Sequence, residues 1–201
     1  MIKTNARFRP ARESDASDLA CLHDIASRGT MFWFWSTSRE PGQSAIEVGR
    51  NRIRTNTDSP TYYRNSTIAE IGGAVAGALI GRLMPTPYHR DDTADLPEVF
   101  APVLELEAIA IGSWYLNVVA VYPEFRGHGL GSALLWHAER IARKSGAPWM
   151  SLNVEDANAG ALRFYLRHGF TERARRPCVP FPGSMDEGDW VLLGKELAEG
   201  A

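Results

Sequence analysis

Runs of apolar residues recur along this chain with the two spacings that distinguish helices from strands. Leu19, Leu22 and Ile25 fall on one face of a helix that a polar residue, Ser14 or Asp15, can cap. Other runs are short and bounded by glycine, proline or asparagine, as strands are. The pattern predicts strands at 5–11, 67–71, 75–83, 114–121, 149–154, 178–181 and 190–193. It predicts helices at 43–54, 129–145 and 158–168, and a first helix that ends near Gly29.

Strands and helices intermingle along the chain, which predicts an α/β fold with a mixed, mostly antiparallel sheet flanked by helices. The length of 201 residues fits one large domain or two very small ones. The chain has no internal repeat and no linker composition, so we expect a single domain over residues 1–201. An acidic, proline-containing insertion at about 85–113 interrupts it, and long connections of this kind are usually functional or disordered.

The charge balance narrows the class of partner. There are 22 Lys and Arg residues against 24 Asp and Glu, so neither nucleic acid nor an anionic membrane surface is favoured as a partner. No segment approaches the ~20 apolar residues of a membrane span, and the charged N-terminal residues do not resemble a signal peptide. Cys21 and Cys178 match no metal or redox spacing. We therefore expect a cytoplasmic protein with two reduced thiols and no metal.

The most informative segment lies between the strand at 114–121 and the helix at 129–145. After Pro123, glycines alternate at positions 127, 129 and 131, and the helix begins at once. Glycine allows close approach of backbone N–H groups and positive φ. The free amides and the dipole of a helix N-terminus attract anions. The segment therefore predicts a diphosphate site, although the glycines fit neither the P-loop nor the Rossmann spacing.

Two motifs resemble those of the GNAT superfamily, the acyl-CoA-dependent N-acyltransferases. The first is R-x-x-G-x-G, formed by Arg126, Gly129 and Gly131. The second is N-x-x-A-x-x-[FL]-Y-x-x-x-G-F, which begins at Asn158, includes Tyr165 and ends at position 170. The order and separation of the two motifs also fit the family. The resemblance covers roughly residues 5–200, and it is specific over about 114–170.

The resemblance implies a binding site for acetyl-CoA as co-substrate. Its diphosphate would be held by the loop residues Arg126, Gly127, Gly129, Leu130, Gly131 and Ser132. In the family the pantetheine arm lies beside the preceding strand, and a backbone amide binds the acetyl carbonyl. Counted back from the loop, that amide would belong to Val119, and Val121 would contact the pantetheine. Asn158 would cap its helix or contact the pantetheine.

The resemblance also suggests catalytic residues. Tyr165 would be the general acid that assists departure of the CoA thiolate. Tyr115 occupies a position where a family carboxylate can sit, and Asn117 follows on the same face; neither is a good base, and we assign both to substrate binding. Glu105 and Glu107 alternate with leucines, so both could face one cavity. Glu107 is then the candidate base and Glu105 a substrate-binding residue. A water relay, or a solvent-facing pair of glutamates, stays open.

The expected function is transfer of an acetyl group from acetyl-CoA to a primary amine, by direct attack in a ternary complex. The acidic insertion would favour a small cationic amine. Two alternatives stay open: a protein N-terminal or lysine acetyltransferase, and a non-catalytic acyl-CoA sensor. Dimers are common among similar proteins, so a homodimer is also an open expectation.

Overall fold

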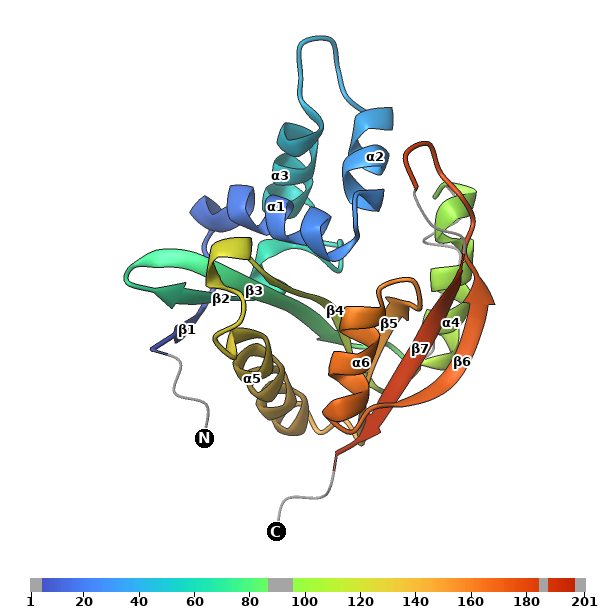
Figure 1. The fold of residues 1–201 in the computed structure, drawn as a ribbon. Helices are drawn as coiled ribbons and strands as arrows, with labels where there is room; N and C mark the ends of the chain where they lie inside the picture. The colour runs from blue at the N-terminus through green and yellow to red at the C-terminus, as the bar shows by residue number, and fades with distance from the viewer. Residues whose placement is uncertain (1–4, 87–95, 185–187, 198–201) are drawn as a thin grey trace. The chain divides into compact units, whose positions relative to one another are not determined.

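The computed structural model describes residues 5–86, 96–184 and 188–197 (Figure 1). The strands are β1 (Arg7–Pro10), β2 (Ser66–Ile71), β3 (Ala74–Leu83), β4 (Trp114–Val121), β5 (Trp149–Glu155), β6 (Thr171–Pro177) and β7 (Asp189–Glu196). The helices are α1 (Ala16–Ala26), α2 (Thr30–Thr37), α3 (Ala45–Thr55), α4 (Ala101–Ile109), α5 (Leu130–Lys144) and α6 (Ala159–Arg167). Short 3-10 turns precede several of them.

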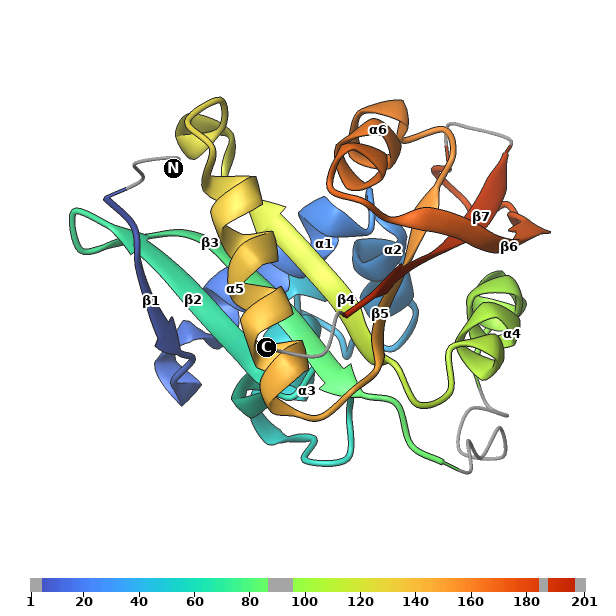
Figure 2. The ribbon, with the colours of Figure 1, turned by 90° about the horizontal axis from the view of Figure 1, so that it is seen from below.

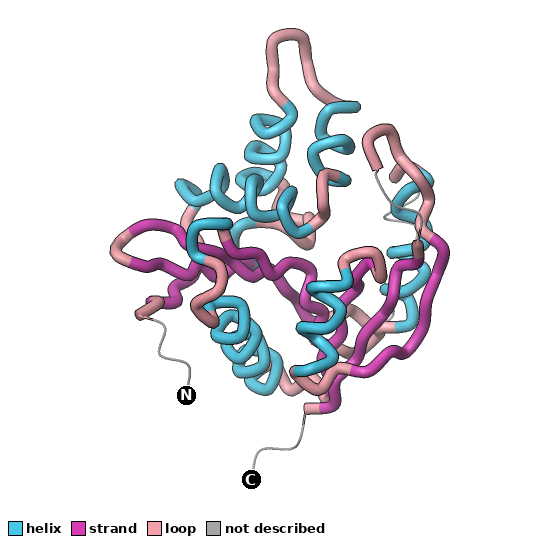
Figure 3. The backbone as a smooth tube through the Cα atoms, in the orientation of Figure 1, coloured by secondary structure: helices cyan, strands magenta, loops and turns pink. Residues whose placement is uncertain are grey.

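The described strands form one sheet in the order β1-β2-β3-β4-β5-β7-β6. Antiparallel pairing joins β1 with β2, β2 with β3, β5 with β7, and β7 with β6. The pairing of β4 with β5 is parallel. Helices flank the sheet, as the tube in Figure 3 shows. The expected mixed, mostly antiparallel sheet is therefore confirmed.

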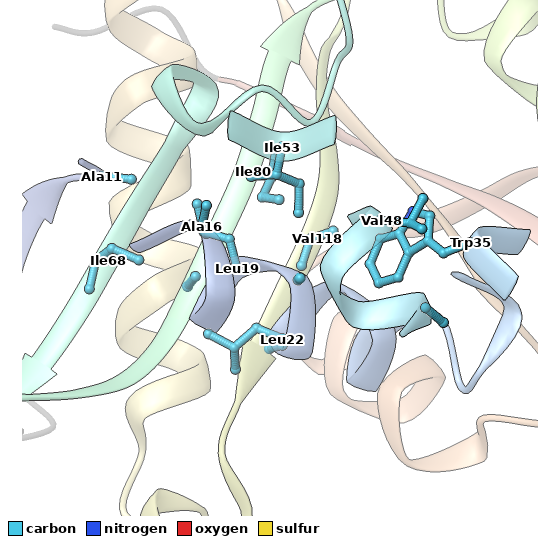
Figure 4. Close-up of a cluster of buried hydrophobic side chains, with 14 residues drawn as sticks. Ala11, Ala16, Leu19, Leu22, Trp35, Val48, Ile53, Ile68, Ile80 and Val118 are labelled. Atoms are coloured by element: carbon cyan, nitrogen blue, oxygen red, sulfur yellow. The ribbon is translucent and has the colours of Figure 1, made fainter. Parts of the chain in front are cut away.

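The chain divides into two compact units, Met1–Arg82 with Asn117–Ala138 and Leu83–Leu116 with Glu139–Ala201, by the contacts of its described residues. In the first unit, α1 and α3 cover one face of the strands and the start of α5 covers the other (Figure 1). Leu19, Trp35 and Val118 belong to the buried cluster beneath the helices (Figure 4). Gly49 is required there, because a Cβ atom would lie 2.5 Å from the Trp35 ring.

In the second unit, α4 packs against β6 and β7, and α6 packs against β5. The two helices lie on opposite faces of these strands (Figures 1 and 2). Leu106 and Ala110 of α4 are buried together with Tyr115 and Leu192. Two buried hydroxyls, on Ser113 and Ser151, are 2.5 Å apart, and the Ser113 hydroxyl also donates to the Ala110 carbonyl. This hydroxyl pair holds the end of α4 against the first residues of β4 and β5.

Two of the expected elements differ from the structure. The strand predicted at 178–181 is wrong, because the strand that pairs with β7 is β6, at Thr171–Pro177. This edge strand consists mainly of glutamate and arginine, so apolar alternation does not reveal it. The acidic connection at 85–113 contains α4; its residues 87–95 lie outside the described part. The single domain expected over 1–201 stays a prediction.

Candidate functional site

The backbone of β4 presents its amides alternately to two edges. Tyr122, directly after the strand, donates its N–H to the Ala76 carbonyl of β3 at 3.0 Å. Because N–H groups two residues apart face the same edge, Val118 and Ala120 also address β3. The amides of Val119 and Val121 then face the opposite edge. Along that edge, the described residues of β4 that pair with β5 are Trp114 and Tyr115, at the start of the strand.

Arg126 supports this assignment of edges. Its Nε donates to the Val121 carbonyl at 3.0 Å, so this carbonyl faces away from β3. The rest of the side chain is exposed. Arg126 therefore folds the start of the loop back onto the end of β4.

The loop after Arg126 has the backbone that the glycine spacing predicts. Gly127 and Gly129 have φ of 81° and 79°, a region that glycine enters without the steric cost paid by other residues. The first bond of α5 runs from the Ala133 N–H to the Gly129 carbonyl at 3.1 Å. The amides of Leu130 and Gly131 thus precede the first helical bond, at the N-terminus of α5. A helix end of this kind is suited to bind a phosphate.

Helix α6 carries the two polar residues of the second motif. The Asn158 side chain accepts from the Ala161 N–H at 3.3 Å, which confirms it as the helix cap. Tyr165 is half-buried. Its ring contacts those of Phe170 and Phe164 edge-on, with distances between ring centroids of 5.8 and 5.2 Å. Burial raises the pKa of Tyr165 to about 12. The phenol therefore stays protonated at neutral pH.

The expected pairing of Glu105 and Glu107 on one face is wrong, because both residues lie on helix α4. Residues two apart on a helix point in different directions, whereas on a strand they share a face. The Glu105 carboxylate forms an ion pair with Arg176 at 2.7 Å, and both side chains are about 40% exposed. Glu107 is buried, with 7% exposure. The two carboxylates therefore occupy different surroundings.

The other two residues expected at the acceptor site also differ in their surroundings. Tyr115 is packed among apolar side chains at 3% exposure. Asn117 is the first residue of β4 within the first compact unit, and its Oδ1 is buried without a hydrogen-bond partner. A buried amide oxygen without a partner is costly, which makes Asn117 a position where a donor from a ligand would be stabilising.

The structure thus gathers Asn117, Val119, Val121 and the loop residues along one continuous segment of the first unit. Tyr165, Asn158, Glu105, Glu107 and Tyr115 belong to the second unit. Sequence reasoning missed the Ser113–Ser151 pair, since two serines 38 residues apart carry no recognisable signal.

The described residues hold neither a metal-binding cluster nor a membrane-spanning helix. In these parts of the chain, no group of three or more His, Cys, Asp or Glu side chains is arranged to hold a metal ion. None of the helices there is long and apolar enough to cross a membrane. The location of the protein stays a prediction.

The sequence profile described as "Acetyltransferase (GNAT) family" matches residues 30–170. One similar curated protein is the streptothricin acetyltransferase of Streptomyces lavendulae, with 32% identity over 89 residues, 42% of this chain and 47% of that protein. The chain spans less than half the length of the curated relatives it matches, from 16% to 47%.

Solved structures resemble the whole described fold. A crystal structure of an acetyltransferase superposes with a TM-score of 0.65 at 23% identity, covering 95% of this chain and 99% of that one. The yncA protein of Salmonella typhimurium, solved with its cofactor acetyl-CoA, superposes with a TM-score of 0.57 at 20% identity, covering 98% and 97%. At these identities the likeness shows the fold.

Proposed function

The chain belongs to the acetyltransferase (GNAT) family, and we propose that it transfers an acetyl group from acetyl-CoA to a primary amine. The observation that carries the proposal is the continuity of β4 with the loop that follows it. A strand edge with outward amides at Val119 and Val121 leads directly into a loop with positive-φ glycines and then into the N-terminus of α5. An extended arm that ends in a diphosphate matches these two features in order.

In the proposed reaction the neutral amine nitrogen attacks the thioester carbon directly. The C–N bond forms, the electron pair of the carbonyl moves to oxygen, and the Val119 N–H stabilises that oxyanion. The C–S bond then breaks, its electron pair leaves with sulfur, and the nitrogen loses its remaining excess proton. A donor aimed at such an oxyanion lowers the barrier by about 3–4 kcal/mol in comparable acyl transfers.

Tyr165 is proposed to assist the leaving thiolate. Because burial raises its pKa to about 12, the phenol is a weaker acid than a thiol, whose ordinary pKa is about 8.5. Its contribution would therefore be a hydrogen bond to the developing thiolate, with the final proton supplied as CoA leaves. This role needs a protonated phenol, which the raised pKa maintains.

Glu107 is proposed as the base that accepts the amine proton. The support is its burial on α4, at 7% exposure. The Glu105 side chain is 41% exposed and forms the ion pair with Arg176. Glu105, Tyr115 and Asn117 remain proposed contacts of the acceptor, and Asn117 has the strongest support because its amide oxygen is buried without a partner.

The proposed acceptor is a small amine, and the proposed enzyme needs no metal. A protein acceptor, or a sensor that binds acyl-CoA without turnover, would use the same loop. The decisive experiment is a screen of amines that reads free thiol released from acetyl-CoA, followed by mass measurement of the acetylated product. Tyr165→Phe serves as the matched variant. Thiol release that no amine or peptide stimulates, together with tight CoA binding, would favour the sensor and contradict the enzyme.

A further inference from the structure

Helix α5 exposes a tryptophan that its packing does not need. The apolar face that packs α5 against the protein consists of buried side chains: Leu130, Leu134, Leu135, Ala138 and Ala142. Trp136 lies on the other side of the helix and is 45% exposed. All six tryptophans lie in the described residues, and the other five are buried or half-buried.

Trp136 stands one helical turn beyond the proposed diphosphate loop. Ser132 and Trp136 are four residues apart, so they share a face of α5. Long side chains on a helix lie back over the turn on the N-terminal side of their own Cα. A Trp136 indole in this preferred direction lies over the turn that contains Ser132, near the N-terminal end of α5. Both residues belong to the first compact unit.

We infer that Trp136 is the platform on which the adenine ring of the acyl carrier stacks. The inference rests on the proposed function, because it requires the diphosphate of CoA to bind at residues 126–132. A ribose separates the base from the diphosphate by a span comparable to one helical turn, ~5.4 Å. Stacking on an aromatic face suits any base and needs no hydrogen-bond partner in the protein.

The size of the exposed surface favours a single ring as its occupant. The other large apolar side chains that are exposed among the described residues are Phe32, Leu83, Leu96, Ile109, Ile111 and Leu166, and none lies on α5. One isolated indole is far smaller than the apolar centre of a protein interface. It is comparable in area to a purine, and it continues a site that would already hold the adjoining diphosphate.

The test compares acetyl-CoA with an acetyl thioester of pantetheine diphosphate that ends in ribose and carries no base. Trp136→Ala is expected to raise the KM for acetyl-CoA about 5- to 30-fold, in the lower part of the range for base stacking on an aromatic ring. Its kcat stays unchanged, because the contact is remote from the thioester. Trp136→Phe keeps an aromatic face and retains most of the affinity. Leu83→Ala, which truncates another exposed apolar side chain (50% exposed), is the control.

The analogue without a base separates the outcomes. If Trp136→Ala weakens both thioesters equally, or neither, the stacking inference is overturned while the proposed function stands. If the wild-type protein binds neither thioester, the proposed function fails and the inference fails with it. Fluorescence gives a second measurement. The emission of Trp136, obtained as wild type minus Trp136→Phe, should be quenched by CoA and unaffected by the analogue without a base. Thermal unfolding of each variant checks that it is folded.

Discussion

The loop at residues 126–132 and helix α4 represent two ways of building a site. In the proposed function the loop acts through its backbone: Gly127 and Gly129 adopt positive φ, and α5 begins directly beyond them. In the same proposal helix α4 acts through side chains, and there Glu105 and Glu107 have separate surroundings although they are two residues apart. The backbone conformation of the loop can be predicted from the positions of its glycines in the sequence. The direction of each side chain depends on whether the segment is a helix or a strand. A short sequence pattern does not distinguish the two.

The largest effect should come from changes to the side chains of α4. Glu107→Gln is expected to lower kcat by about 100- to 1000-fold, the usual effect of losing a general base. Glu105→Gln is the matched control, with a change below about 3-fold, because the exposed Glu105–Arg176 pair contributes little. Steady-state kinetics with a saturating amine measures both. Equal losses in the two variants would mean that the distinction between the carboxylates is wrong.

The backbone half is tested by a side chain at a left-handed position. Gly129→Val should weaken CoA binding about 100-fold, because φ of 79° is strained for valine and the loop must move. Gly112 has a similar φ of 76° outside the loop. Gly112→Val therefore imposes comparable strain and should leave the dissociation constant of CoA unchanged. Calorimetric titration with CoA distinguishes them, and parallel losses would point to general destabilisation.

A smaller effect is expected at Arg126, whose side chain donates to the backbone carbonyl of Val121. Arg126→Gln should weaken CoA binding about 10-fold, through loss of charge near the phosphates and of the bond to the Val121 carbonyl. Arg126→Lys keeps the charge but has no Nε donor in that position. An intermediate affinity for the lysine variant supports both contributions. Full affinity would leave the bond to Val121 without a role in binding.

The smallest effect concerns pH. In the proposed mechanism Tyr165 acts in its protonated form. Burial raises its pKa to about 12, so the protonated form persists until the pH approaches that value. The ratio of wild-type to Tyr165→Phe single-turnover rates should therefore be constant between pH 7 and about pH 10. A ratio that declines from pH 8 or 9 would mean that the phenol titrates near its ordinary value and is not desolvated.

Local signals in the sequence predicted much of the fold. The bounds of β4 follow from an apolar run that ends before Pro123, and α5 ends just before Gly146, as the glycine indicated. In contrast, β6 was missed because its residues are mostly charged, and it is a strand through its pairing with β7. Pairing of distant segments leaves little trace in a local pattern.

The candidate site divides in the same way. The glycine loop was predictable, since few residues other than glycine adopt its backbone. The surroundings of Glu105 were not, because its partner Arg176 is 71 residues away. The exposure of Trp136, in contrast, follows from its spacing, since it lies opposite the apolar face that Leu134, Leu135 and Ala138 form.

The alternation of amides along β4 has a consequence for acyl carriers. Every second amide belongs to the sheet through β3, so a paired ligand arm can shift along the strand only by two residues at a time, about 6.8 Å. In the proposed function, β4 therefore accepts the ligand arm only in registers that are two residues apart. A carrier lengthened by one methylene could not settle into a neighbouring register. Its thioester would overshoot the Val119 amide, and transfer would slow while the diphosphate stayed bound, which kinetics with such an analogue would reveal.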